Sequence, residues 1–196
     1  MKKTMKAVAA SMLMMTVMCT AGCSKSYDSK DYVDLGLPSG LLWGTRNVGA
    51  ESSEDYGSYF LSGDATPKSV SNRDTYVTLK SGDDAATASW GDGARTPTVD
   101  EWQELSEHCT FVWTTLNGVN GIRLTGSNGN SLFLPAAGCR ANDMLVYAGD
   151  YGYYLSSTLD THHQNYAWCF HFYPDFANMT SGNMDFAFSV RPVRKR

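Results

Sequence analysis

The amino-acid sequence predicts an α+β domain with a mainly antiparallel sheet of short strands, one or two short helices and long loops. Three observations lead to this fold class. Short apolar runs that alternate with polar residues recur along the chain, and clusters of Gly, Asn, Ser and Pro separate them. One ten-residue stretch instead has apolar residues at helical spacing. The 196 residues suffice for one domain with a hydrophobic core.

The N-terminus has the composition of a secretory signal. Three lysines within the first six residues precede an apolar run, 7–18, which is shorter than the ~20 residues that span a bilayer. The run is followed by Thr20-Ala21-Gly22-Cys23, which resembles a bacterial lipobox, the motif whose cysteine is acylated and becomes the mature N-terminus. We expect residues 1–22 to be removed and Cys23 to carry lipid, which would anchor the chain at the outer membrane or cell surface. An ordinary cleaved signal with a chance cysteine is the alternative.

The next segments predict a tether and the start of the domain. Residues 23–31 are polar and are expected to form a lipidated tether, so that 32–196 make up a single domain. Alternating apolar residues in 33–37 and the run 41–45 predict two strands joined by a Pro-Ser-Gly turn. Residues 61–90 are rich in Ser, Thr, Asp, Gly and Ala, which predicts mostly loop.

The clearest helix is predicted for residues 99–108. Thr98 is a favourable N-cap, and Glu101 three residues later completes a capping box. Helical spacing places three apolar side chains on one face, Val99, Trp102 and Leu105. Cys109 extends this stripe, and we expect the stripe to be buried together with Trp43.

The second half of the sequence predicts a hairpin and two further strands. The alternating runs 122–124 and 132–134 flank an Asn-Gly turn, which predicts a β-hairpin. A strand over 166–173 alternates Tyr166, Trp168, Phe170 and Phe172 on one face with Ala167, Cys169, His171 and Tyr173 on the other. A last strand covers 186–190. The Tyr166–Phe172 stripe is expected in the core, as are Phe186 and Phe188.

Charge and cysteine content exclude several classes of function. The signal contains three of the 16 basic residues and none of the 20 acidic ones, so the mature chain has a formal net charge of −7. This acidity argues against nucleic acid as a partner. Cys109, Cys139 and Cys169 remain in the mature domain, at spacings that match no zinc pattern. They are expected to be buried small residues, and one disulfide with a spare thiol is the alternative.

Several motifs occur in the order found in a known family. They include Tyr32-Val33-Asp34-Leu35-Gly36-Leu37-Pro38-Ser39-Gly40-Leu41-Leu42-Trp43, Asn47-Val48-Gly49-Ala50, Leu134-Pro135-Ala136-Ala137-Gly138, Gly152-Tyr153-Tyr154-Leu155-Ser156-Ser157-Thr158 and Ser189-Val190-Arg191-Pro192-Val193-Arg194. Together they resemble the Fibrobacter succinogenes major paralogous domain, which is common in surface lipoproteins of gut Bacteroidetes. The resemblance implies a C-type-lectin-like or formylglycine-generating-enzyme-like fold, with a Trp-bearing helix and a strand that ends on Arg-Pro-Val-Arg.

The region between residues 142 and 182 is the predicted ligand-binding face. The wider segment 141–190 contains no Lys, Arg or Glu, and 12 of the chain's 24 aromatic residues lie between 147 and 188. Aromatic side chains mixed with Asn, Ser and His are typical of recognition surfaces, and sugar rings stack on such faces. The candidate binding residues are Tyr151, Tyr153, Tyr154, His162, His163, Asn165 and Tyr173. Whether the tyrosines are exposed or belong to an aromatic core is left open by the pattern.

The sequence contains no coherent catalytic or cofactor-binding motif. No phosphate-binding glycine loop follows a strand, and no Gly-x-Ser-x-Gly motif occurs. Asp160, His162, His163 and His171 could supply metal ligands, but adjacent histidines on a strand point in opposite directions, so we predict no metal and no cofactor. We therefore predict a lipid-anchored, non-catalytic binding or adhesion module for a glycan or protein ligand. An enzyme of the formylglycine-generating type and an accessory subunit of a surface appendage are the alternatives.

Overall fold

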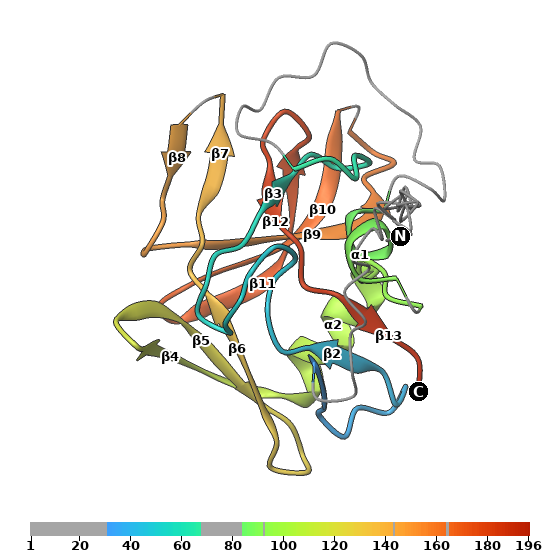
Figure 1. Ribbon diagram of the computed structural model, residues 1–196, viewed down its shortest axis with the longest axis vertical. Coiled ribbons are helices and arrows are strands. Elements are labelled where there is room, and N and C mark those ends of the chain that lie inside the picture. Colours follow the sequence, from blue (N-terminus) through green and yellow to red (C-terminus); the bar gives the residue numbers. More distant parts are fainter. Residues whose placement is uncertain (1–30, 68–83, 92, 143, 164) are drawn as a thin grey trace, which may run out of the picture.

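The computed structural model describes residues 31–67, 84–91, 93–142, 144–163 and 165–196. Within these ranges the chain forms four sheets and two short helices, which confirms the predicted α+β class (Figure 1). All strand pairs between named strands are antiparallel except one pair in the largest sheet. The expected signal, the lipidation site Cys23 and tether residues 24–30 lie outside the described residues.

A small sheet joins the two ends of the domain. Strand β2 (Leu42–Gly44) lies between β1 (Tyr32–Asp34) and β13 (Val193–Arg194), and both pairs are antiparallel. Trp43 of β2 is fully buried, as predicted. Asp31, the last residue of the expected tether, is buried, and its carboxylate pairs with Arg46 at 2.7 Å.

The largest sheet has five strands in the order β11-β10-β9-β12-β3. These are Phe176–Asn183, Tyr166–Tyr173, Gly152–Leu159, Phe188–Ser189 and Tyr59–Phe60. The predicted strand over 166–173 is therefore confirmed. The expected strand over 186–190 is shorter, because only Phe188 and Ser189 pair with neighbouring strands. β12 runs parallel to β9 and antiparallel to β3.

Helix α2 (Val99–His108) packs against one face of this sheet and has the predicted bounds and capping box. The Thr98 hydroxyl accepts from the backbone N–H of Glu101, and the Glu101 carboxylate accepts from the backbone N–H of Thr98. Trp102 is fully buried, and its indole stacks on Phe170 of β10 with a centroid distance of 4.8 Å. Leu105 and Cys109 are also buried and belong to the main core, whereas Val99 at the start of the predicted stripe is only half-buried.

A second antiparallel sheet contains the predicted hairpin. It consists of β4 (Thr110–Leu116), β5 (Val119–Thr125) and β6 (Ser131–Pro135). In the β5–β6 register, Ile122 pairs with Leu134 and Leu124 pairs with Leu132, and these four side chains face the core. A separate hairpin of β7 (Cys139–Ala141) and β8 (Met144–Val146) projects from the body of the molecule (Figure 1).

A short helix falls within the segment 61–90 that the sequence indicates as loop. Helix α1 (Ala85–Trp90) occupies its end, whereas residues 68–83 lie outside the described residues. Asp84 is its N-cap, because the carboxylate accepts from the backbone N–H of Thr87 at 2.8 Å. Trp90 is buried and meets the ring of Tyr32 edge-on. The Ser, Thr and Gly residues around this helix obscure the local cap in the sequence.

Candidate ligand-binding face

The face of the five-stranded sheet opposite α2 carries a continuous set of aromatic rings. In the β9–β10 register Phe170 pairs with Tyr154, and His171 pairs with Tyr153. Because neighbouring residues of a strand point to opposite faces, Phe170 and Tyr154 enter the core, and His171 and Tyr153 point the other way. The aromatic face, as we define it, comprises Tyr147, Tyr151, Tyr153, His171, Tyr173 and Phe176.

The rings of the aromatic face stack on one another across the strands. The His171 and Tyr153 rings are parallel within 4°, with centroids 4.4 Å apart, and Tyr173 stacks on Phe176 at 4.8 Å. Tyr151 lies over His171 at 5.7 Å. Parallel rings at about the spacing of adjacent strands stand upright on the sheet. Stacked neighbours therefore cover one another's ring faces.

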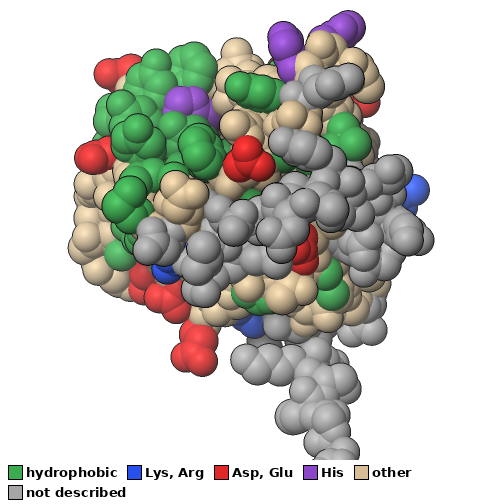
Figure 2. All heavy atoms as spheres, turned by 90° about the horizontal axis from the view of Figure 1, so that it is seen from above, with side chains coloured by type: hydrophobic (Ala, Val, Ile, Leu, Met, Phe, Trp, Pro, Cys, Tyr) green, Lys and Arg blue, Asp and Glu red, His purple; other side chains and the backbone are tan. Residues whose placement is uncertain are grey.

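One end of the aromatic face is buried and the other end is open. Tyr153 stacks on the buried Phe188 and packs against a core cluster that includes Leu155 and Cys169. At the open end Tyr147 is 56% exposed, and Met144 and Leu145 of β8 are 59% and 41% exposed. Figure 2 shows the resulting continuous hydrophobic area on the side of the β7–β8 hairpin. Exposed apolar areas of this kind mark interaction sites.

The aromatic face is uncharged at neutral pH. The segment 141–190 contributes no Lys, Arg or Glu. Burial lowers the pKa of His171, so its imidazole is neutral at pH 7, and Nε2 is buried without a hydrogen-bond partner among the described residues. Burial raises the pKa of Tyr153 to about 12, so its hydroxyl remains protonated. A charged ligand group would gain no opposite charge from these side chains.

Tyr154 does not belong to the binding face, which corrects its place among the candidates. The side chain is fully buried, and its hydroxyl donates to the carbonyl of Pro135 at 2.9 Å. The same hydroxyl accepts from Nδ2 of Asn47 at 3.3 Å. Tyr154 therefore stabilises the core. Its neighbours Tyr151, Tyr153 and Tyr173 are half-buried and are brought together by the sheet.

The remaining candidates lie on the connection between β9 and β10. His162, His163 and Asn165 are exposed, and no ring of the aromatic face contacts the two histidines within the described part of the chain. His162 and His163 contact Asp160, whose carboxylate accepts from the backbone N–H of His162 and from the Ser181 hydroxyl at 2.6 Å and lies 2.8 Å from Nδ1 of His163. The structure therefore separates these candidates from the tyrosines.

The cluster around Asp160 does not have the geometry of a catalytic triad. A nucleophilic serine needs a hydrogen bond from its hydroxyl to the imidazole, but Ser181 donates to the carboxylate instead. The cysteines offer no alternative, because burial raises the pKa of Cys109 and Cys139 to about 11 and that of Cys169 to about 12. Across the described ranges, no group of three or more His, Cys, Asp or Glu converges on a metal position.

Five residues of this surface are not among the binding candidates from the sequence. Tyr147, His171, Phe176, Met144 and Leu145 lie inside the predicted functional region, and of these the sequence indicates only His171, as a possible metal ligand. Their signal was weak, because apolar and aromatic residues occupy both faces of these strands. Two residues expected in the core are instead 38% and 39% exposed, Tyr166 and Phe186. Both lie next to turns, where the sheet no longer covers them.

Residues 117–193 match the family of a domain of unknown function, DUF8237. No curated protein and no solved structure matches the chain. The matched segment contains the whole aromatic face and the strands that support it, from β5 to β12. In the described part of the chain, no helix is long and apolar enough to cross a membrane.

Proposed function

We propose that this chain is a non-catalytic binding module of the cell envelope and that its aromatic face binds a protein partner. The observation that carries this proposal is the aromatic face with the exposed Met144 and Leu145 beside it. Aromatic residues and Met are enriched at protein interfaces, whereas Lys and Glu are depleted. The segment 141–190 has this composition.

The orientation of the rings favours a protein over a stacked sugar as the main ligand. A pyranose that stacks on an aromatic residue needs a free ring face. In the pairs His171–Tyr153 and Tyr173–Phe176 one face of each ring is covered by its partner, and second stacked rings also cover Tyr153 and His171. A protein surface with apolar side chains contacts ring edges and the Leu145 side chain equally well. Such a partner also gains from the water that the exposed apolar area releases.

A glycan is the second candidate ligand, and the tyrosine hydroxyl groups favour it. Tyr147, Tyr151, Tyr153 and Tyr173 line the face, and Asp150 is exposed beside Tyr151. Hydroxyl and carboxylate groups next to an apolar surface suit the mixed polar and C–H character of a neutral sugar. In this case the exposed Tyr147 would supply the stacking ring.

The envelope location and the finer fold are also part of the proposal. Lipidation of Cys23 would anchor the domain through the tether, as the lipobox-like motif indicates. A C-type-lectin-like architecture is supported by the pairing of β13 with β2 and by Trp102 on α2. The burial of Cys109, Cys139 and Cys169 supports a binding role over an enzyme of the formylglycine-generating type, which needs a reactive thiol site.

Site-specific photo-cross-linking in the producing cells tests the main proposal. A benzophenone amino acid at Tyr147 is expected to give one discrete protein adduct. The same group at Val112, which is 62% exposed on β4 of another sheet, is the matched control and is expected to give none. Leu145→Lys should abolish the Tyr147 adduct, because it places a charge in the apolar contact. Identical adducts at both positions, or no adduct at Tyr147, would contradict a protein partner.

Affinity electrophoresis in gels that contain soluble neutral polysaccharides tests the second candidate. Retardation of the wild-type protein that is lost in Tyr147→Ala, with an unchanged thermal melt, would replace the protein partner by a glycan. Equal migration in every gel, together with a specific cross-link, would leave the protein partner as the ligand.

A further inference from the structure

A cavity of about 310 Å³ lies on the outer side of the β4–β5–β6 sheet and shares no residue with the aromatic face. The segment after β2 forms its opposite wall. Its lining is half apolar and half polar and includes Leu116, Phe133, Thr45, Ser53, Ser131 and Arg123. This volume is at the lower end of the ~300–1,000 Å³ typical of small-molecule sites, so it suits a ligand with a single ring.

A buried arginine fixes one end of this cavity. Arg191 is fully buried and donates from Nη1 to the carbonyl of Gly44 and from Nη2 to the carbonyl of Phe133, each at 3.0 Å. Gly44 directly precedes the lining residue Thr45, whereas Phe133 is itself a lining residue. One guanidinium thus holds the two walls together. Their separation is set before any ligand arrives.

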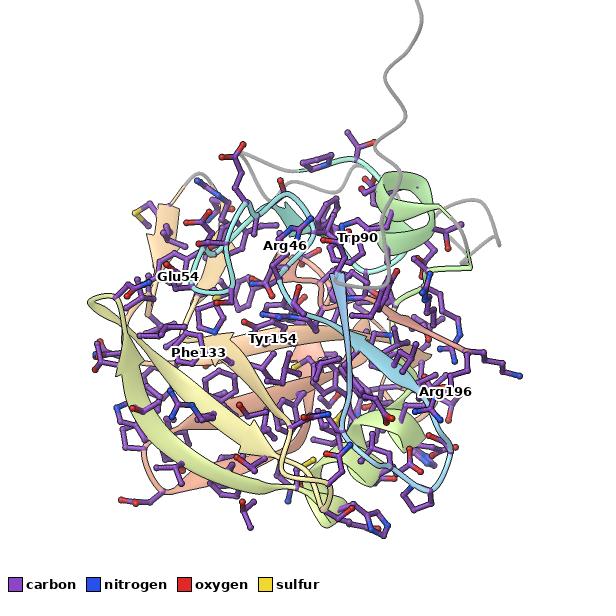
Figure 3. All side chains as sticks on the ribbon, turned by 60° about the horizontal axis from the view of Figure 1, so that its bottom comes forward. Arg46, Glu54, Trp90, Phe133, Tyr154 and Arg196 are labelled. Atoms are coloured by element: carbon purple, nitrogen blue, oxygen red, sulfur yellow. The ribbon has the colours of Figure 1, made fainter. Side chains whose placement is uncertain are left out.

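A surface hydrogen bond fixes the other end. Nδ2 of Asn117 donates to Oε1 of Glu54 at 2.7 Å, and these residues directly follow the lining residues Leu116 and Ser53. In Figure 3 Glu54 lies beside the turn between β4 and β5, with Phe133 further along the sheet. The hydrogen bond lowers the pKa of Glu54, so its carboxylate is ionised at neutral pH. A negative ligand group is therefore disfavoured at this end.

Arg123 gives the end of the cavity far from Glu54 a positive charge. It is exposed on β5 and pairs in register with Phe133. Within the described residues, no acceptor forms a hydrogen bond or ion pair with its guanidinium, which is the only charged group of the lining. Ser131 lies next to Thr125 in the same register and adds a hydroxyl group at this end. An unpaired arginine fork matches the geometry of a carboxylate.

We propose that this cavity binds a small carboxylate with a ring-shaped body, such as an acidic monosaccharide. The carboxylate pairs with Arg123 at the end far from Glu54. The ring contacts Phe133 and Leu116, and ligand hydroxyl groups meet those of Ser131 and Thr45. The site is independent of the aromatic face, so the chain carries two recognition surfaces on different sheets.

Calorimetric titration of the purified protein with D-glucuronate and with benzoate tests this site. At least one of the two ring carboxylates is expected to bind saturably, and D-glucuronamide, which lacks the charge, is expected to bind at least tenfold more weakly than D-glucuronate. Arg123→Gln should weaken binding at least tenfold. Lys195→Gln removes the same charge from an exposed residue outside the cavity and should leave affinity within twofold.

Three outcomes would overturn the proposal. They are the failure of both carboxylates to bind, equal affinity of the acid and the amide, and full affinity in Arg123→Gln. A thermal melt of Arg123→Gln separates lost binding from lost folding, and we expect no change because the side chain is exposed. Amide chemical shifts should move at Ser131 and Phe133 when the ligand is added. Shifts confined to the aromatic face would also contradict the assignment.

Discussion

The guanidinium of Arg191 donates from Nε to Oδ1 of Asn47 at 2.9 Å, and both side chains are fully buried. The same Asn47 donates from Nδ2 to the carbonyl of Tyr56 at 2.9 Å. Burial lowers the pKa of Arg191 to about 10, which still leaves it charged at pH 7. Neutral oxygens thus solvate this buried charge, and they come from segments far apart in the sequence.

Arg191→Lys is expected to destabilise the domain by about 3–5 kcal/mol, the range for breaking a buried charged network. A lysine carries one donor group and cannot reach the Asn47, Gly44 and Phe133 oxygens together. Urea unfolding measures the effect. Arg123→Lys is the matched control, because Arg123 is exposed, and its effect should stay within about 0.5 kcal/mol. Similar losses in the two variants would show that the network adds no stability.

Two buried tryptophans are expected to respond differently to replacement by phenylalanine. Trp102 donates from Nε1 to the carbonyl of Leu155 at 3.1 Å, whereas Nε1 of Trp43 has no hydrogen-bond partner among the described residues. Trp102→Phe removes a hydrogen bond to a buried carbonyl, but Trp43→Phe removes a donor that was already unpaired. The loss of unfolding free energy should therefore be larger for Trp102→Phe by about 1 kcal/mol. A larger loss in Trp43→Phe would contradict this account.

Elements that depend on local signals could be predicted from the sequence. The bounds of α2 follow from a cap at Thr98 and the spacing of Trp102 and Leu105, and all three signals lie within eight residues. The β5–β6 hairpin follows from alternation around a turn, which also sets its register. Tertiary packing does not override these signals, because it buries the same apolar faces.

The binding face depends on contacts that no local pattern contains. Tyr153 and Tyr154 are neighbours with the same side chain, and only the packing of α2 on one sheet face decides which is buried. Irregular β9–β10 pairing between Ala167 and Cys169 further obscures the alternation. The Arg191 network joins residues up to 147 positions apart, so the sequence alone could not indicate it.

The three described thiols are expected to resist alkylation in the folded protein. Burial raises the pKa of Cys109 and Cys139 to about 11, so on the order of one thiol in a thousand is ionised at pH 8. Iodoacetamide at pH 8 should leave all three cysteine-containing peptides unmodified until urea is added, as mass spectrometry would show. Val112→Cys places a thiol at a 62% exposed position and should react at once. Rapid reaction of a native thiol would instead indicate an accessible and reactive cysteine.

The stability of the domain should depend on pH through Asp160. Hydrogen bonds from Ser181 and His163 and from the backbone N–H of His162 lower its pKa from the ordinary value of 3.8. A carboxyl group whose pKa is lower in the folded than in the unfolded chain stabilises the fold fully above the unfolded value. This contribution is lost as the pH falls from about 3.8 toward the folded pKa.

Urea unfolding of the wild type and Asp160→Asn between pH 7 and pH 2.5 tests this pH dependence. The wild type should be more stable by a constant amount down to about pH 4. Below that pH the difference should shrink, because the carboxylate in the unfolded wild-type chain becomes protonated while the one in the folded chain is still ionised. Ser181→Ala keeps the carboxylate but removes its 2.6 Å hydrogen bond, so its folded pKa rises and its advantage over Asp160→Asn should be smaller at every pH. A wild-type advantage that is equal at pH 7 and pH 2.5 would rule out Asp160 as the titrating group.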